Sequence, residues 1–186
     1  MPLAPTTRTA LVTGAARRIG AAIARDLAAH GWGVAVHYHT SRVEAEAVAA
    51  EIRASGGSAV TVRADLADLS ALPGLVDDAV AALGPIGVLI NNASEFEPDE
   101  IGALDPVRLE RHLRLDLASP VLLADAWLAR LPAGVEGHVI NVVDQRVLAP
   151  TPRFFSYTLA KSALWTATRT MAQALAPRVR VNAIGP

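Results

Sequence analysis

The feature that most constrains the fold is a regular alternation of short aliphatic runs with longer segments of helical apolar spacing. Six runs predict strands, at Thr9–Thr13, Gly33–Tyr38, Ser58–Arg63, Val88–Asn91, His138–Val143 and Val179–Ala183. The segments between them predict helices at Ile19–His30, Ser41–Ala54, Ser70–Leu83, within Arg108–Leu131, and at Phe154–Leu175. Strands that alternate with helices in this way predict a parallel sheet covered on both faces.

We therefore predict an α/β chain of Rossmann type, in which a doubly wound parallel sheet is the middle of three α/β/α layers. No linker, low-complexity tract or internal repeat divides the sequence, so we expect one domain over residues 1–186. The sequence ends at Gly185-Pro186, directly after a predicted strand. Ligands in such folds bind at the carboxyl ends of strands. We expect one wall of the site to be missing, disordered or supplied elsewhere.

Composition narrows the classes of function. The formal net charge is −1, which favours neither nucleic acid nor an anionic membrane as a partner. The chain has no cysteine, which excludes disulfides and cysteine-bound metals; we expect no metal site and a cytoplasmic location. Met1–Thr9 lacks the apolar segment of a signal peptide, and no apolar run approaches the roughly 20 residues of a membrane span. A small molecule is therefore the expected partner.

A glycine turn joins the first predicted strand to the first predicted helix, with the sequence Thr13-Gly14-Ala15-Ala16-Arg17-Arg18-Ile19-Gly20. Gly14 permits a tight turn, and Gly20 lets the helix pack close to the sheet. The start of the helix then offers free N–H groups to a phosphate. The alternative is an ordinary loop. Arg18 stands where dinucleotide-binding turns usually have a middle glycine, so it is either solvated or a cation beside the pyrophosphate or the substrate.

The end of the second predicted strand bears on the choice of cofactor. NAD enzymes usually place an Asp or Glu there, about 20 residues after the turn, to hold the ribose 2′-hydroxyl. This chain has His37-Tyr38-His39-Thr40-Ser41-Arg42, and no carboxylate precedes Glu44. A carboxylate would repel a 2′-phosphate, whereas hydroxyls, an imidazole and Arg42 would accept one. We therefore predict that the cofactor is NADP(H). The alternative is that His39 and Thr40 are loop residues with no part in binding. Ser41 is also a candidate helix N-cap, with Glu44 completing a capping box.

Tyr157 and Lys161 are four residues apart, which places both side chains on one face of a helix. Lys161 is the one lysine of the chain, beside 16 arginines, and Tyr157 is one of two tyrosines. A neighbouring ammonium stabilises a phenolate, so we expect the pKa of Tyr157 to be lowered toward neutrality, as suits a general acid. The alternative is an exposed helical pair with no catalytic role.

Asp144 follows the fifth predicted strand, at the end of the strand where this fold places its chemistry. The alternative is an aspartate that caps a turn. A carboxylate near Tyr157 would oppose phenolate formation unless it is protonated or relays a proton.

Together these motifs resemble the short-chain dehydrogenase/reductase family. The matching residues are the Thr13–Gly20 turn, Asp65-Leu66, Asn91-Asn92-Ala93, Tyr157 with Lys161, Val181-Asn182 and Gly185-Pro186. Most members have serine where this chain has Asp144. That aspartate, Arg18 and the run His37–Ser41 resemble the pteridine reductase branch, which includes dihydromonapterin reductase-like enzymes.

The resemblance implies a set of site residues. Those implied to bind the cofactor are Gly14, Arg17, Arg18, Ile19, Tyr38, His39, Thr40, Ser41, Ala64, Asp65, Leu66, Asn92, Ala93, Ser94, Tyr157, Lys161 and Pro186. Within this set Asp65 and Leu66 lie near the adenine, Ser94 reaches the phosphates or the pterin, and Lys161 holds the nicotinamide ribose. Those implied to bind substrate are Arg18, Ser94, Phe96, Asp144 and Tyr157.

The resemblance also implies what these residues do. Asp144, Tyr157 and Lys161 are the catalytic residues, and Phe96 sandwiches a pterin against the nicotinamide. The alternative for Phe96 is a core phenylalanine. Many family members have asparagine, holding a relay water, where this chain has Asp116. Members commonly form homotetramers through the helix that bears the tyrosine, and Ala163–Leu175 is apolar enough for that. Members also continue past the position of Gly185-Pro186 with a substrate loop, a helix and a final strand, so the resemblance implies that this sequence lacks them.

The function expected from all this is NADPH-dependent reduction of a C=N bond in a pterin or dihydropterin. Two alternatives stay open. One is reduction of a carbonyl, such as a 3-oxoacyl thioester or another ketone. The other is an NADP-binding protein without catalytic activity.

Overall fold

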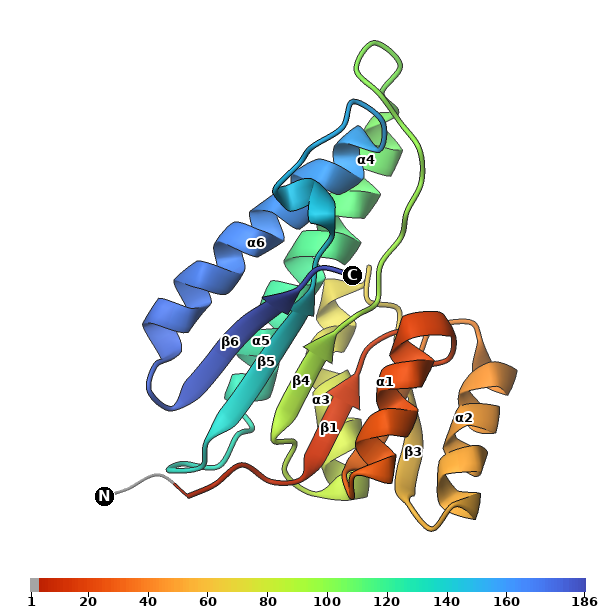
Figure 1. The fold of residues 1–186 in the computed structure, drawn as a ribbon, viewed down its shortest axis with the longest axis vertical. Coiled ribbons are helices and arrows are strands. Elements are labelled where there is room, and N and C mark those ends of the chain that lie inside the picture. Colours follow the sequence, from red (N-terminus) through yellow and green to blue (C-terminus); the bar gives the residue numbers. More distant parts are fainter. Residues whose placement is uncertain (1–3) are drawn as a thin grey trace.

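The computed structural model describes residues 4–186, and the chain forms one six-stranded sheet (Figure 1). Its strands are β1 (Thr9–Val12), β2 (Gly33–Tyr38), β3 (Ser58–Arg63), β4 (Val88–Asn91), β5 (Gly137–Val142) and β6 (Val179–Ile184). All neighbours pair in parallel, in the order β3-β2-β1-β4-β5-β6. This is the doubly wound Rossmann order, and it reverses direction between β1 and β4. The predicted fold class is confirmed.

In the described part of the chain, six α-helices connect the strands: α1 (Arg18–Ala29), α2 (Arg42–Ala54), α3 (Leu72–Leu83), α4 (Pro106–Leu113), α5 (Ser119–Leu128) and α6 (Phe155–Leu175). Short 3₁₀ turns lie at η1 (Leu69–Ala71) and η3 (Gln145–Val147). The helix expected within Arg108–Leu131 begins earlier, at Pro106, because Asp105 accepts a hydrogen bond from the Val107 N–H at 3.0 Å. Its middle is a π-helical segment, η2 (Arg114–Ala118), between α4 and α5.

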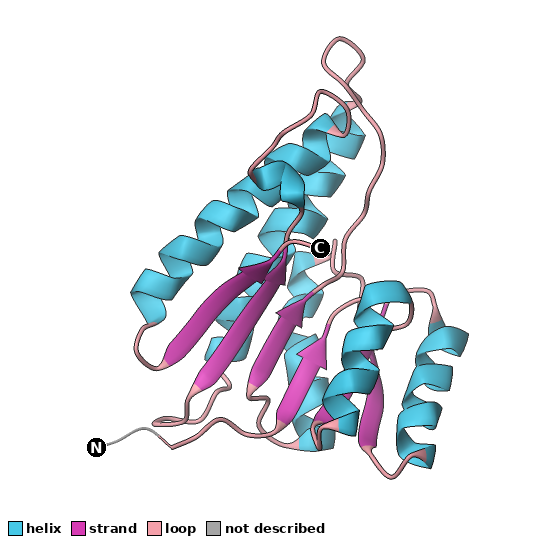
Figure 2. Cartoon of the chain, viewed as in Figure 1, coloured by secondary structure: helices cyan, strands magenta, loops and turns pink. Residues whose placement is uncertain are grey.

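The helices lie on both sides of the sheet (Figure 2) because successive strand residues point to opposite faces. Leu11 packs in a core with residues of α3, α5 and α6, while its neighbours Ala10 and Val12 pack in a second core with α1 and α2. The largest fully buried side chain is Trp127 of α5, whose indole N–H donates to the Ile86 carbonyl at 2.7 Å.

A buried polar chain fixes α6 against the middle of the sheet. The Asn91 amide of β4 donates to the Asn141 side chain of β5 at 2.8 Å, and Asn141 donates to the Thr168 hydroxyl of α6, also at 2.8 Å. Buried polar groups specify a unique packing when every member finds a partner. This series of hydrogen bonds therefore fixes the position of α6. Its earlier turns, which carry Tyr157 and Lys161, lie beyond the strand ends.

The capping box expected at α2 is wrong. Ser41 occupies the N-cap position, but its side chain makes no capping hydrogen bond. Glu44 instead lies 3.7 Å from Arg17, across the gap between α2 and α1. The ion pair with Arg17 is a tertiary contact, and the spacing of residues within one helix does not reveal such contacts.

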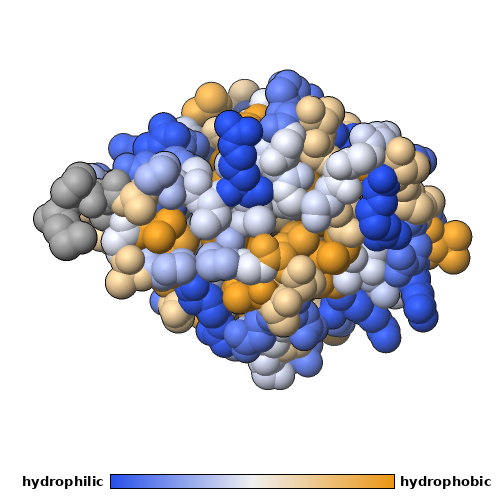
Figure 3. All heavy atoms as spheres, turned by 90° about the horizontal axis from the view of Figure 1, so that it is seen from below, coloured by the Kyte–Doolittle hydropathy of each residue, from blue (hydrophilic) through white to orange (hydrophobic). Residues whose placement is uncertain are grey.

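The amino-terminal ends of the strands form the face seen from below in Figure 3, where hydrophilic and hydrophobic side chains are mixed and apolar atoms gather near the middle. Within residues 4–186, no helix combines the length and apolar character that a membrane crossing requires. Of the segment Met1–Thr9, for which no signal peptide is expected, the first three residues lie outside the described part of the chain.

Candidate active site

A cavity of about 930 Å³ lies over the carboxyl ends of the strands. It includes residues that follow β1 and β4, between which the strand order reverses, where doubly wound folds bind ligands. Eighteen of the predicted site residues line it: Gly14, Arg17, Arg18, Ile19, Tyr38, His39, Thr40, Ser41, Asp65, Leu66, Asn92, Ala93, Ser94, Phe96, Asp144, Tyr157, Lys161 and Pro186. Ala64 and Arg42 are not among the lining residues.

The glycine turn leaves no room for side chains. Gly14 has φ +62°, and a Cβ there would lie 2.9 Å from the Ala93 Cα. A Cβ on Gly20 would lie 2.4 Å from the Gly14 carbonyl oxygen. The Thr13 hydroxyl accepts from the N–H groups of Asn92 and Ala93 at 2.9 and 3.0 Å, which ties the turn to β4. A close backbone turn before an uncapped helix start is the cradle that a dinucleotide phosphate fits.

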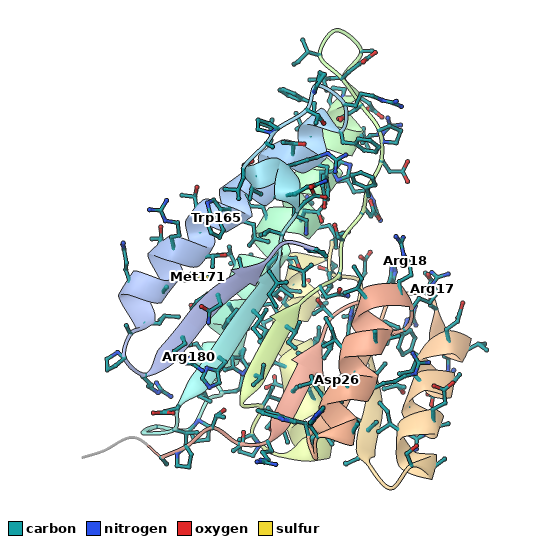
Figure 4. All side chains as sticks on the ribbon, viewed as in Figure 1. Arg17, Arg18, Asp26, Trp165, Met171 and Arg180 are labelled. Carbon is teal, nitrogen blue, oxygen red and sulfur yellow. The ribbon has the colours of Figure 1, made fainter. Side chains whose placement is uncertain are left out.

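Arg17 and Arg18 stand at the start of α1 and point toward the same end of the molecule as the strand tips (Figure 4). Arg17 makes one long ion pair with Glu44, and both side chains are exposed, so the pair holds the guanidinium weakly. Arg18 is a non-glycine residue with φ +52°, a conformation that such residues seldom adopt. Both cations are therefore free to meet an anionic ligand at the cavity.

His37 has a role that the sequence did not reveal. Its Nδ1 accepts from the Gly14 N–H at 3.0 Å, and its Nε2 lies 3.2 Å from the Ala64 carbonyl, to which it donates. Burial lowers the pKa of His37 to about 4. It is therefore a neutral residue that supports the glycine turn. The available signal was an imidazole within an otherwise aliphatic strand.

Tyr157 and Asp144 meet at the end of β5. The Tyr157 hydroxyl donates to Asp144 Oδ2 at 3.2 Å, and the tyrosine is 6% exposed. Its pKa is raised, first by burial and then by the carboxylates of Asp144 and Asp116. The expectation of a pKa lowered toward neutrality is therefore wrong, because desolvation and two carboxylates outweigh one ammonium.

Lys161 is 2% exposed, so the alternative of an exposed helical pair is wrong. Its ammonium donates to the Val142 carbonyl at 3.0 Å and lies 3.5 Å from Asp116 Oδ1 and 5.7 Å from the centre of the Tyr157 ring. Burial lowers the pKa of Lys161, and the Asp116 carboxylate opposes that shift. A buried ammonium next to the reacting phenol can hold a ribose hydroxyl and stabilise developing negative charge.

Asp144 contacts both Tyr157 and the turn that follows β5. Its Oδ1 accepts from the Arg146 N–H at 2.8 Å, which caps η3, so the turn-capping alternative also holds. The Arg146 guanidinium lies 3.3 and 3.2 Å from the two carboxylate oxygens, a partner that the sequence analysis missed. Nothing in a two-residue spacing within a loop predicts this ion pair.

Phe96 is 48% exposed and lines the cavity, so the alternative of a core phenylalanine is wrong. Phe154 stacks on it with ring centres 3.9 Å apart and 6° between planes, and does not itself line the cavity. The Arg146 Cζ is 5.1 and 5.2 Å from the two ring centres. A point equally far from two stacked rings lies beside their edges, so Arg146 borders the pair and covers neither face. Phe96 is thus an aromatic wall backed by a second ring.

This geometry agrees with the comparisons. The family model described as short chain dehydrogenase matches residues 8–186. The chain belongs to the short-chain dehydrogenase family. The predicted family and class of enzyme, an oxidoreductase, are confirmed.

Among solved structures, the chain is similar to FolM alternative dihydrofolate reductase 1 from Brucella canis, with 53% identity and a TM-score of 0.93 over 96% of this chain and 70% of that one. That structure is a complex with NADP, which confirms the predicted cofactor among close relatives. The chain is 33% identical to pteridine reductase 1 of Leishmania tarentolae, covering 100% of this chain and 78% of the relative. It is 34% identical to a 3-oxoacyl-[acyl-carrier-protein] reductase of Synechocystis, covering 97% and 74%.

Asp116 lies among several polar side chains. The carboxylate is fully buried and accepts from the Ser94 hydroxyl at 2.5 Å and from His112 Nδ1 at 3.0 Å. His112 is 1% exposed and was not predicted. Its only sequence signal was a spacing of four residues from Asp116 within a helix. Across residues 4–186, no cluster of side chains suits a metal ion.

Proposed function

We propose that this short-chain dehydrogenase uses NADPH to reduce a C=N bond of a pterin or dihydropterin. The observation that carries the proposal is the carboxylate of Asp144 within hydrogen-bond distance of the Tyr157 hydroxyl, where the family usually has a serine. A carboxylate can accept hydrogen bonds from the amino and ring N–H groups of a pterin, which a ketone does not have. Similarity to proteins named pteridine reductase and alternative dihydrofolate reductase supports it.

The protein's own part is binding, orientation and proton delivery. The glycine turn and the start of α1 receive the phosphates, with Arg17 and Arg18 nearby. When bound, the nicotinamide supplies a hydride to the carbon of the C=N bond. Tyr157 delivers its hydroxyl proton to the nitrogen, so that the double bond gains one hydride and one proton. Lys161 stabilises the phenolate that remains.

The raised pKa of Tyr157 fits this order of events. Burial and two carboxylates keep the phenol protonated. The proton therefore leaves only when negative charge develops on the substrate nitrogen. Phe96 offers a flat apolar face for the ring system, and Ser94 and Arg18 line the same cavity.

A second candidate is reduction of a carbonyl, which the similarity to a 3-oxoacyl-[acyl-carrier-protein] reductase favours. Substitution of Asp144→Ser discriminates between the two. A pterin reductase should lose most of its activity because the anchor for the substrate N–H groups is gone. A carbonyl reductase should keep its activity or gain, since serine supports carbonyl chemistry in most of the family.

The direct test measures NADPH oxidation by the purified protein with dihydrobiopterin or dihydrofolate, with NADH as the cofactor control. Turnover should require NADPH and should disappear in Tyr157→Phe, although this variant should still bind NADPH. Good turnover of a ketone with none of any pterin would overturn the proposal. NADPH binding without turnover of any substrate would favour the non-catalytic alternative.

We also propose a cytoplasmic homotetramer. The absence of cysteine suits a reducing compartment. Leu159 of α6 is 44% exposed, as an apolar residue at a subunit interface would be in a separated chain. Sedimentation velocity tests the assembly, and a monomer at micromolar concentration would contradict it.

A further inference from the structure

The π-helical segment η2 places the side chain of Asp116 in the core, behind Tyr157 and Lys161. Asp116 lies in this segment and is fully buried, and His112, one turn earlier in α4, is 1% exposed. A π-turn adds a residue to one turn of the helix and so rotates the side chains that follow; such turns are common at functional sites. The proton delivery proposed above involves Asp116 only through its charge and gives His112 no role.

Three donors converge on the Asp116 carboxylate from three different parts of the chain. The Ser94 hydroxyl, after β4, donates to Oδ1 at 2.5 Å. The Lys161 ammonium, on α6, lies 3.5 Å from the same oxygen. His112 Nδ1 lies 3.0 Å from the other oxygen, Oδ2. Because a carboxylate accepts from all three, it fixes its donors relative to one another.

The tautomer of His112 follows from this arrangement. An ionised carboxylate only accepts hydrogen bonds, so Nδ1 carries the proton that points at Oδ2. The other ring nitrogen, Nε2, is buried and has no partner. Leaving a buried polar atom unpaired is unfavourable, so the imidazole is retained here at some expense of stability. The His112 ring also lies edge-on to Tyr157, with centres 6.1 Å apart.

We propose that His112 is a positioning residue of this reductase: its Nδ1–H holds the Asp116 carboxylate in the orientation that places the Lys161 ammonium and the Ser94 hydroxyl beside Tyr157. His112 touches neither ligand nor reacting atoms; it acts through Asp116. The proposal rests on the reductase function proposed above and adds to it a residue that no motif in the sequence indicates.

The charges around the phenol explain why the orientation of Asp116 matters. Asp144 with its partner Arg146 faces Tyr157 from η3, Lys161 faces it from α6, and Asp116 faces it from η2. Asp116 is the carboxylate within 4 Å of the ammonium, so it sets how much of that positive charge reaches the phenol. A small movement of this carboxylate changes the balance that keeps Tyr157 protonated.

Three substitutions of His112 distinguish the effect of its hydrogen bond on kcat from the effect of its ring volume. In His112→Asn the amide nitrogen takes the place of Nδ1 and can still donate to Asp116. In His112→Gln the amide nitrogen takes the place of Nε2 instead. His112→Leu fills the space without a donor. The proposal expects kcat within about twofold of the parent in His112→Asn and about tenfold lower in the other two, the effect of losing one hydrogen bond to a charged group.

KM and the Kd for NADPH should change less than kcat in all three variants, because His112 does not itself line the cavity. Asp116→Asn should move the basic limb of the kcat pH profile to lower pH, since Tyr157 loses one of the carboxylates that raise its pKa.

Asp99→Asn is the matched control. Asp99 is another buried carboxylate that accepts from a serine hydroxyl, that of Ser156, and it packs on the same helix, α6. It makes no ion pair with Lys161. Its substitution should change the melting temperature but leave the pH profile of kcat unchanged.

A second measurement needs no substrate. The long-range ¹H–¹⁵N spectrum of the parent protein should show the Nδ1–H tautomer for His112, identified by the resonance that His112→Asn removes. A different tautomer would overturn the proposal even if a variant failed to fold. So would a His112→Leu enzyme with the parent's kcat and pH profile, or equal rescue by Gln and Asn. Failure of pterin turnover alone would leave this spectrum unaffected, so the two proposals fail separately.

Discussion

Acid should destabilise this protein through His37, the neutral histidine that supports the glycine turn. Burial lowers the pKa of His37 from 6.5 to about 4. Between these values the unfolded chain binds a proton at this residue and the folded chain does not. The stabilisation is therefore fully present above pH 6.5 and is lost as the pH falls toward 4. At 1.36 kcal/mol per pKa unit, the loss is about 3 kcal/mol by pH 4.

The assay is urea unfolding at a series of pH values from about 7.5 to 4, on the parent protein and on His37→Asn. Asparagine can accept from the Gly14 N–H, as Nδ1 does, but does not titrate. Carboxylates contribute equally to both curves, so their difference isolates the histidine. The free energy of unfolding should fall by about 3 kcal/mol more in the parent than in the variant. Parallel curves would refute the reasoning, because they would mean that His37 titrates normally in the folded protein.

Three further substitutions test the packing around the site. Gly20→Ala should lower stability by about 3 kcal/mol and weaken NADPH binding in calorimetry, because its Cβ would lie 2.4 Å from a backbone carbonyl; unchanged binding would contradict this. Trp127→Ala should cost about 4 kcal/mol in urea unfolding, since it empties the centre of one core, with kcat retained in the folded fraction. Thr168→Val should cost about 2 kcal/mol by leaving the Asn141 amide without an acceptor, and a neutral result would show that the amide finds another.

The sequence predicted the architecture well because its signals are local. Aliphatic runs of the right length, the Thr13–Gly20 turn and the helical spacing around Tyr157 each belong to one segment. Since parallel strands end at one edge of the sheet, residues after different strands were expected to meet there. The cavity brings together Gly14, Asn92 and Asp144 as that rule requires.

The errors came from partners far apart in the sequence. Glu44 pairs with Arg17 instead of completing a capping box within its own helix. The Tyr157 pKa moves upward because the phenol is buried and because Asp144 and then Asp116, 41 residues earlier, add their negative charges. Asp116 also lies close to the ammonium that was expected to lower this pKa. Neither contact leaves a mark in the spacing of neighbouring residues.

The sequence by itself determined the strand and helix order, the glycine turn, the absence of an acid at the second strand, and Tyr157 with Lys161 on one helix face. These depend on backbone geometry and on periods of a few residues. Only the tertiary structure decided the charges of the site. His37 is buried and neutral beneath the glycine turn, Arg146 pairs with Asp144, and Asp116 lies between His112 and Lys161. Electrostatic energies depend on distance and on exclusion of water, and both are fixed only when distant segments pack.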